Sequence, residues 1–169
     1  CYALIAYGYP RRETDPVIAY EDFRRGLAIA QASGNRQLES HLAGNLSMVA
    51  AAQGDVLDAL DHLTRAIRNH CDSGSFSLLL TPLAILASVL DRLGRYKAAA
   101  TISGFASTPF TRGSFPEMND LIAHLREVLG DQIYESLAHH GEMMTAAAIA
   151  AYAYDQIDQA RAELTGVSN

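Results

Sequence analysis

The sequence predicts an all-α fold built from helical hairpins, and three observations lead to this prediction. Alanine supplies much of the apolar content, which is 49% of the 169 residues, and β-branched residues are sparse, a composition that suits helices. Asp-Pro, Ser-Gly and Gly-Asp pairs divide the chain into segments of helical length. Turn residues and apolar residues recur at a spacing of 40, as expected of a repeated unit.

Five helices are expected within the first 106 residues. Asp15 followed by Pro16 is an N-cap with proline at the first helical position. Asp55 caps a later helix, and Pro82 must either kink its helix or mark a late start. In order, the helices are expected at residues 17–32, 36–53, 55–71, 75–93 and 96–106, with glycine-containing turns between most of them.

The spacing of 40 residues is found in the turns as well as in the apolar positions. A hairpin of this length cannot cover its apolar face alone, so neighbouring hairpins would stack to bury it. Small residues at fixed positions would let the helices approach closely. The residues that define the repeat are Ala19, Gly54, Ala59, Leu63, Ala66, Gly94 and Ala99.

These residues resemble the tetratricopeptide repeat, whose turn glycine, small alanine, bulky residue and second alanine match the second unit. The first and third units depart from the pattern at Thr14, Gly26 and Ser103. The resemblance implies a right-handed superhelix of helical hairpins over residues 1–106. The period of 40 rather than 34 implies longer helices, as in the tetratricopeptide-like arrays of large bacterial regulators.

The period is lost after residue 106. Residues 107–116 are rich in Ser, Thr, Gly and Pro and are expected to form a loop. Residues 117–169 are expected to form an irregular helical cap, because terminal units of repeat arrays are commonly atypical. Its three helices are expected at residues 117–129, 132–140 and 145–164.

The segment LREVLGDQIYESLAHHGEMMTAAAIAAYA (125–153) resembles the closing segment of large multidomain bacterial signalling proteins. In that group a helical repeat region follows a signal-transduction ATPase module, and a class III adenylate cyclase or a LuxR-type helix-turn-helix domain accompanies it. The resemblance implies a non-catalytic, cytoplasmic region that binds a partner or senses an effector. Its partners would be domains of the same parent chain, a separate protein or peptide, or a small polar effector. The alternative is a free-standing adaptor that binds a peptide or protein partner.

The binding groove of such an array is lined by the first helix of each hairpin. Carrying these groove positions onto the second and third units selects a set of mixed polarity and little charge, which suits a small polar effector or a partner helix. The candidate groove residues are His41, Asn45, Met48, Thr81, Ile85, Ser88 and Arg92.

The sequence gives no reason to expect catalysis, a cofactor or a metal ion. Motifs for phosphate binding and for nucleophilic serine are absent. The clusters at residues 70–72 and 139–142 combine His with Cys, Asp or Glu, but neighbouring helical residues point in different directions. Asp58 and Asp61 are expected on a solvated helix face. The net charge of −6 disfavours direct binding of nucleic acid.

No transmembrane span or disulfide framework is expected, and the two cysteines fit a reduced cytosolic protein. The opening residues CYALIAYGYP have the character of a helix entered midway, so the chain is expected to be a fragment of a longer protein. Tyr2, Tyr7 and Tyr9 are expected in the core of the first hairpin. An apolar face left uncovered at that end would favour self-association.

Overall fold

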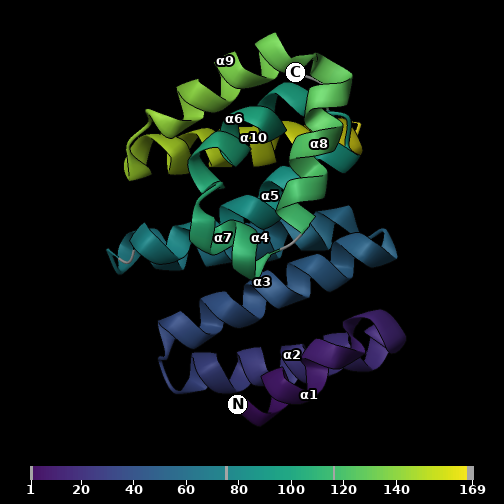
Figure 1. Ribbon diagram of the computed structural model, residues 1–169. Coiled ribbons are helices and arrows are strands. Elements are labelled where there is room, and N and C mark those ends of the chain that lie inside the picture. The colour runs from purple at the N-terminus through teal and green to yellow at the C-terminus, as the bar shows by residue number, and fades with distance from the viewer. Residues whose placement is uncertain (1, 75, 116, 167–169) are drawn as a thin grey trace. The chain divides into compact units, whose positions relative to one another are not determined.

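A computed structural model describes residues 2–74, 76–115 and 117–166, and this part of the chain consists of helices with no β-strand among them. The all-α prediction is therefore confirmed, whereas the tetratricopeptide-like superhelix stays a prediction. The elements are α1 (Tyr2–Thr14), α2 (Pro16–Ala32), α3 (Arg36–Gln53), α4 (Val56–Asp72), the 3-10 helix η1 (Phe76–Leu79), α5 (Leu80–Arg92), α6 (Tyr96–Ala106), α7 (Pro109–Ser114), α8 (Glu117–Leu129), α9 (Asp131–Glu142) and α10 (Ala146–Leu164) (Figure 1).

The chain divides into two compact units, Cys1–Ser75 and Phe76–Asn169. The first unit contains α1 to α4, and the second contains η1 and α5 to α10. This division does not test the expected end of the 40-residue period at residue 106, which stays a prediction.

Local sequence signals begin and end the helices of the first unit. The Asp15 carboxylate accepts a hydrogen bond from the Ile18 amide at 3.3 Å, and the Asp55 carboxylate accepts one from the Asp58 amide at 3.1 Å. Both expected N-caps are therefore present. Gly54 follows α3 with φ of 88°, a left-handed conformation that glycine adopts without steric cost. The helices α2, α3 and α4 begin and end within one or two residues of their expected positions.

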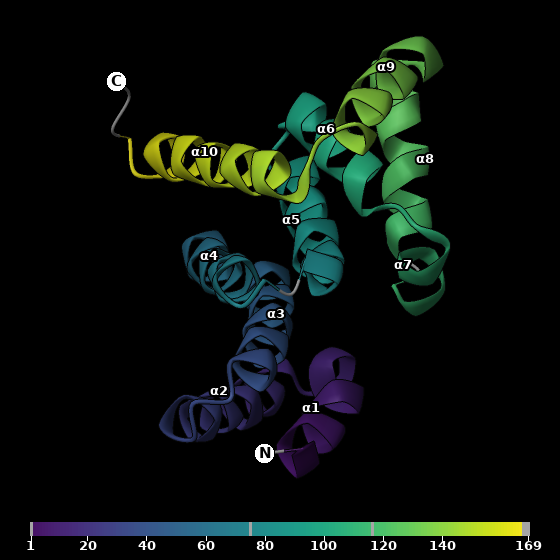
Figure 2. The same cartoon turned by 90° about the vertical axis from the view of Figure 1, so that its left-hand side faces the viewer.

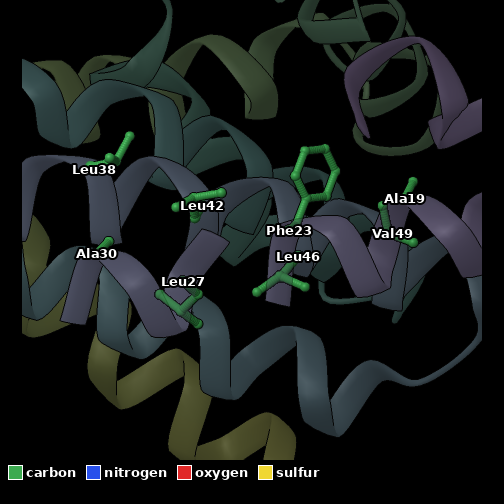
Figure 3. Close-up of a cluster of buried hydrophobic side chains, with 8 residues drawn as sticks. All are labelled: Ala19, Phe23, Leu27, Ala30, Leu38, Leu42, Leu46 and Val49. Carbon is green, nitrogen blue, oxygen red and sulfur yellow. The ribbon is translucent and has the colours of Figure 1, made fainter. Parts of the chain in front are cut away.

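One buried apolar cluster of the first unit lies between α2 and α3, and α4 adds further buried residues such as Leu60 and Leu63. Phe23 of α2 is fully buried, and α3 contributes Leu42 and Leu46 to the same cluster. Figure 3 shows the side chains of the two helices projecting into a shared layer. Gly8 of α1 also lies against this layer, since a Cβ atom at Gly8 would lie 2.6 Å from the Phe23 ring. The cluster consists of Ala19, Phe23, Leu27, Ala30, Leu38, Leu42, Leu46 and Val49.

The position of Gly8 explains why the expectation for the flanking tyrosines is wrong. Tyr7 is 64% exposed and Tyr9 is 48% exposed. Adjacent residues on a helix point about 100° apart, so a helix that turns Gly8 toward Phe23 turns both tyrosines away from the core. The side chain of Tyr2 lies outside the described residues.

Pro82 marks a late helix start, one of the two outcomes expected for it. The 3-10 helix η1 precedes α5, and Pro82 is the third residue of α5. Proline is tolerated in a first helical turn because the amide groups there have no intrahelical partner.

The expected loop at residues 107–116 is wrong in part, because it contains the short helix α7. Thr108 and Thr111 form a reciprocal capping box, and Pro109 occupies the first helical position. The proline therefore begins a helix here, where the sequence analysis assigned it to a loop. The helices expected within residues 117–169 are present as α8, α9 and α10.

Two glycines allow α6 and α9 to approach each other closely within the second unit. A Cβ atom at Gly104 of α6 would meet the carbonyl oxygen of Ala138, and one at Gly141 of α9 would meet the carbonyl oxygen of Thr101. Both contacts would be far closer than real Cβ atoms tolerate. Figure 2 shows α9 alongside α6. The two helices thus pack backbone against backbone.

Arg126 holds the turn between α8 and α9. Its guanidinium donates to the Asp131 carboxylate at 2.8 Å and to the Glu135 carboxylate, and it lies 4.7 Å from the centre of the Tyr134 ring. The connection between the helices is the single residue Gly130. Arg126 therefore links the end of α8 to the beginning of α9 at the protein surface.

Candidate functional site

The accessible positions of α3 and α5 correspond at an offset of 40 residues. Residues 42–47, 49 and 50 are buried on α3, and residues 82–87, 89 and 90 are buried on α5. The exposed His41 corresponds to the exposed Thr81, and the half-buried Met48 corresponds to the half-buried Ser88. The two helices therefore leave the same positions open to a ligand, each within its own unit.

Two of the seven candidate groove residues are not accessible. Asn45 is 6% exposed, and its side-chain amide donates to the backbone oxygen of His41 at 2.9 Å. Ile85, its counterpart on α5, is 3% exposed. Arg92 is exposed at the end of α5. The accessible set is thus His41 and Met48 on α3, with Thr81, Ser88 and Arg92 on α5.

The α3 part of this set lies beside a cation from α1. The Arg12 guanidinium donates to the Met48 sulfur at 3.0 Å and stacks 4.0 Å from the centre of the Tyr9 ring. On α5, the Ser88 hydroxyl donates a hydrogen bond to the backbone oxygen of Ala84, so its donor is used within the same helix. The Met48 thioether and the Arg12 guanidinium therefore lie together, and the His41 imidazole is exposed two turns before Met48 on α3. Met48 and His41 were expected at the groove from the sequence, whereas Arg12 and Tyr9 were not.

A polar cluster between α2 and α4 was not expected from the sequence. The Tyr20 hydroxyl donates to the Asp58 carboxylate at 2.5 Å and lies 3.4 Å from Nε2 of His62. That nitrogen is 3.5 Å from the other carboxylate oxygen of Asp58. Asp58 is half-buried, so its assignment to a solvated face is wrong. The four-residue spacing of Asp58 and His62 is a sequence signal for contact between these two side chains on one helix face. No such signal connects Tyr20 with them, because Tyr20 lies 38 residues before Asp58.

Burial sets the protonation states of this cluster. Burial lowers the pKa of the His62 imidazole, although the Asp58 carboxylate acts in the opposite direction. Burial and the hydrogen bond to Asp58 raise the pKa of Tyr20 to about 12. Near neutral pH the cluster therefore consists of a neutral imidazole, a neutral phenol and a carboxylate. This arrangement links α2 to α4 through the Tyr20–Asp58 hydrogen bond.

The stability of the protein should decline on both sides of a pH plateau. Below the unfolded His value of 6.5, the unfolded chain binds protons that buried His62 and His70 do not, so unfolding becomes easier as pH falls. Above the unfolded Tyr value of 10.0, the unfolded chain releases a proton that Tyr20 retains until about pH 12, so stability falls as pH rises. The free energy of unfolding should be measured in urea at several pH values.

Two variants separate these contributions. His62→Gln should weaken the acid decline, and Tyr20→Phe should weaken the alkaline decline while costing about 1 kcal/mol at neutral pH through the lost hydrogen bond. Wild type and Tyr20→Phe curves that run parallel from pH 8 to pH 12 would contradict the burial of Tyr20.

His70 and His139, from the two other histidine-containing segments named above, lie in different environments. His70 is buried, whereas His139 is exposed and lies 3.6 Å from the Glu142 carboxylate. Within residues 2–74, 76–115 and 117–166, no three His, Cys, Asp or Glu side chains gather in a way that could hold a metal ion. None of the helices in this described part is long and apolar enough to cross a bilayer.

Comparison with protein families, with curated proteins and with solved structures finds no match to the chain.

Proposed function

We propose that the chain is a non-catalytic binding region whose ligand or partner contacts the exposed faces of α3 and α5. The equivalence of these two faces carries the proposal, since the same positions are open on both helices. Each unit thus presents a helix face with the same accessible positions, as expected where repeated hairpins bind a partner through equivalent residues.

The chemistry of the two faces favours a polypeptide partner. His41 and Thr81 offer hydrogen-bonding groups, and Met48 offers a flexible apolar side chain that adapts to irregular surfaces. A partner helix could place an apolar residue on Met48 and polar residues on the neighbouring turns. We infer by resemblance that the parent is a bacterial signalling protein or transcriptional regulator, and the adaptor role is the alternative.

Site-specific photocrosslinking would test this proposal. A benzophenone amino acid placed at residue 41 or residue 81 of the full-length gene product, expressed in its own cells, should capture the same partner from both positions. Residues 68 and 147 provide controls, because Arg68 on α4 and Ala147 on α10 are exposed and lie outside the two faces. Mass spectrometry of the crosslinked species identifies what was captured.

The outcomes distinguish the candidate functions. Crosslinks to another domain of the same polypeptide support the signalling-region proposal, and crosslinks to a separate protein support the adaptor alternative. Equal capture from residues 68 and 147 would show that the faces of α3 and α5 have no special role.

A further inference from the structure

The second unit contains an open hollow of about 500 Å³ that is distinct from the faces of α3 and α5 proposed above. It is lined by the turn between α5 and α6, by the end of α8 and by α10. Its volume is within the range of small-molecule sites, roughly 300–1,000 Å³. Leu93, Tyr96 and Leu129 give it an apolar part, and Arg95, Lys97 and Gln156 give it a polar part.

Arg95 is the central polar residue of this hollow. Its guanidinium donates to the Glu163 carboxylate at 2.7 Å, and to the side-chain oxygens of Gln156 at 3.0 Å and Gln159 at 2.5 Å. All three acceptors belong to α10. The Arg95 side chain is only 14% exposed, and its Nε atom is buried without a hydrogen-bond partner. The cation therefore lies in the wall of the hollow, with its two terminal nitrogens bonded to acceptors of α10.

The carboxylate that pairs with Arg95 is weakly held. The side chain of Glu163 is 68% exposed, so water can solvate it readily if it leaves the guanidinium. Exposed ion pairs contribute little to stability, because water and salt screen them. Glu163 thus occupies a position at the guanidinium that another oxyanion could take.

We propose that this hollow binds a small molecule with an oxyanion head group, either carboxylate or phosphate, and an apolar body. The head group replaces the Glu163 carboxylate on Arg95 and is drawn further by the ammonium of Lys97, which is exposed at the rim. The planar guanidinium matches both kinds of oxyanion. The apolar body lies against Tyr96, Leu93 and Leu129.

Titrations followed by nuclear magnetic resonance test this site on the 169-residue chain. Phenyl phosphate and benzoate serve as separate probes, with inorganic phosphate and acetate as the matching head groups without an apolar body, all at constant ionic strength. We expect saturable shifts of the amide signals of residues 93–98, 156 and 163 for phenyl phosphate, benzoate or both. The apparent affinity should exceed that of the matching small anion at least fivefold, and the probe that binds identifies the head group.

Three variants show whether the binding depends on the proposed contacts. Lys97→Gln should weaken the binding about fivefold, and Glu163→Gln should strengthen it about fivefold because the competing carboxylate is gone. Arg68→Gln removes the same charge as Lys97→Gln from an exposed site on α4, and it should leave the binding unchanged.

Three results would overturn the proposal. The first is the absence of saturable shifts at residues 93–98 with either probe. The second is an equal effect of Lys97→Gln and Arg68→Gln, which would indicate non-specific attraction. The third is a Glu163→Gln variant that loses thermal stability without any gain in binding, because Arg95 would then serve only to hold α10. None of these results bears on the faces of α3 and α5.

Discussion

Replacing Gly104 by alanine should destabilise the protein by about 3 kcal/mol, at the upper end of the usual cost of overpacking. The new Cβ atom would overlap the carbonyl oxygen of Ala138, a backbone atom of α9. A side chain could rotate away from such a clash, but a helix backbone cannot. The helices α6 and α9 would have to separate, and every contact along their interface would weaken.

Gly141→Ala should have an effect of similar size, because the geometry is reciprocal. Its Cβ atom would overlap the carbonyl oxygen of Thr101 on α6. The two substitutions act on one interface from opposite sides. The double variant should therefore cost less than the sum of the single variants, since helices separated by one methyl group already accommodate much of the second.

Gly113→Ala is the matched control for both substitutions. Gly113 lies in α7, and no atom lies within 4 Å of the position its Cβ would take. Alanine is the better helix former by about 1 kcal/mol, so this variant should be neutral or slightly more stable. Urea unfolding compares the three variants directly. If Gly104→Ala were as stable as Gly113→Ala, the close packing of α6 on α9 would be wrong.

Most helices are predictable from the sequence because local signals define their ends. Asp15 and Asp55 cap their helices through contacts three residues away, and such contacts can be recognised from the sequence alone. Pro109 was assigned to a loop because proline occurs both in loops and at the first position of a helix. The capping partner Thr111 was the signal that could have separated these roles.

Contacts between distant helices could not be predicted in the same way. Gly141 was part of the motif that suggested a resemblance, but its contact with Thr101 depends on how α9 packs on α6. The Tyr20–Asp58 hydrogen bond likewise joins helices through packing. Hydrophobic periodicity gives the buried side of each helix, and it does not say which residue of another helix lies opposite.

For the candidate groove too, local spacing was informative and contacts between helices were not predictable. At the 40-residue offset, His41 and Thr81 are both exposed, and Met48 and Ser88 are both half-buried. The offset did not reveal that Asn45 is buried, because α3 packs against both α2 and α4 and is covered on more than one side. A helix in contact with several neighbours leaves only a narrow stripe accessible, so spacing alone selects too many residues.

Leucine in place of Ala59 or Ala99 should cost about 1–3 kcal/mol at each site. Both alanines are fully buried, and each lies in the second helix of its hairpin, 40 residues apart. The added atoms have no space there and would push the paired helices apart. Ala147→Leu is the control, because Ala147 is exposed on α10, and surface substitutions usually stay within about 0.5 kcal/mol.

Hydrogen exchange would show where each substitution acts. Because Ala59 and Ala99 lie in different compact units, Ala59→Leu should speed amide exchange in α3 and α4, and Ala99→Leu should speed it in α5 and α6. If Ala59 and Ala99 are equivalent positions of a repeated hairpin, the two substitutions should destabilise their own units to a similar extent. A large loss at one site with none at the other would mean that the 40-residue spacing relates sequence positions without relating their packing. The matching accessible positions of α3 and α5 would then no longer support the proposal that each unit binds a partner through equivalent residues.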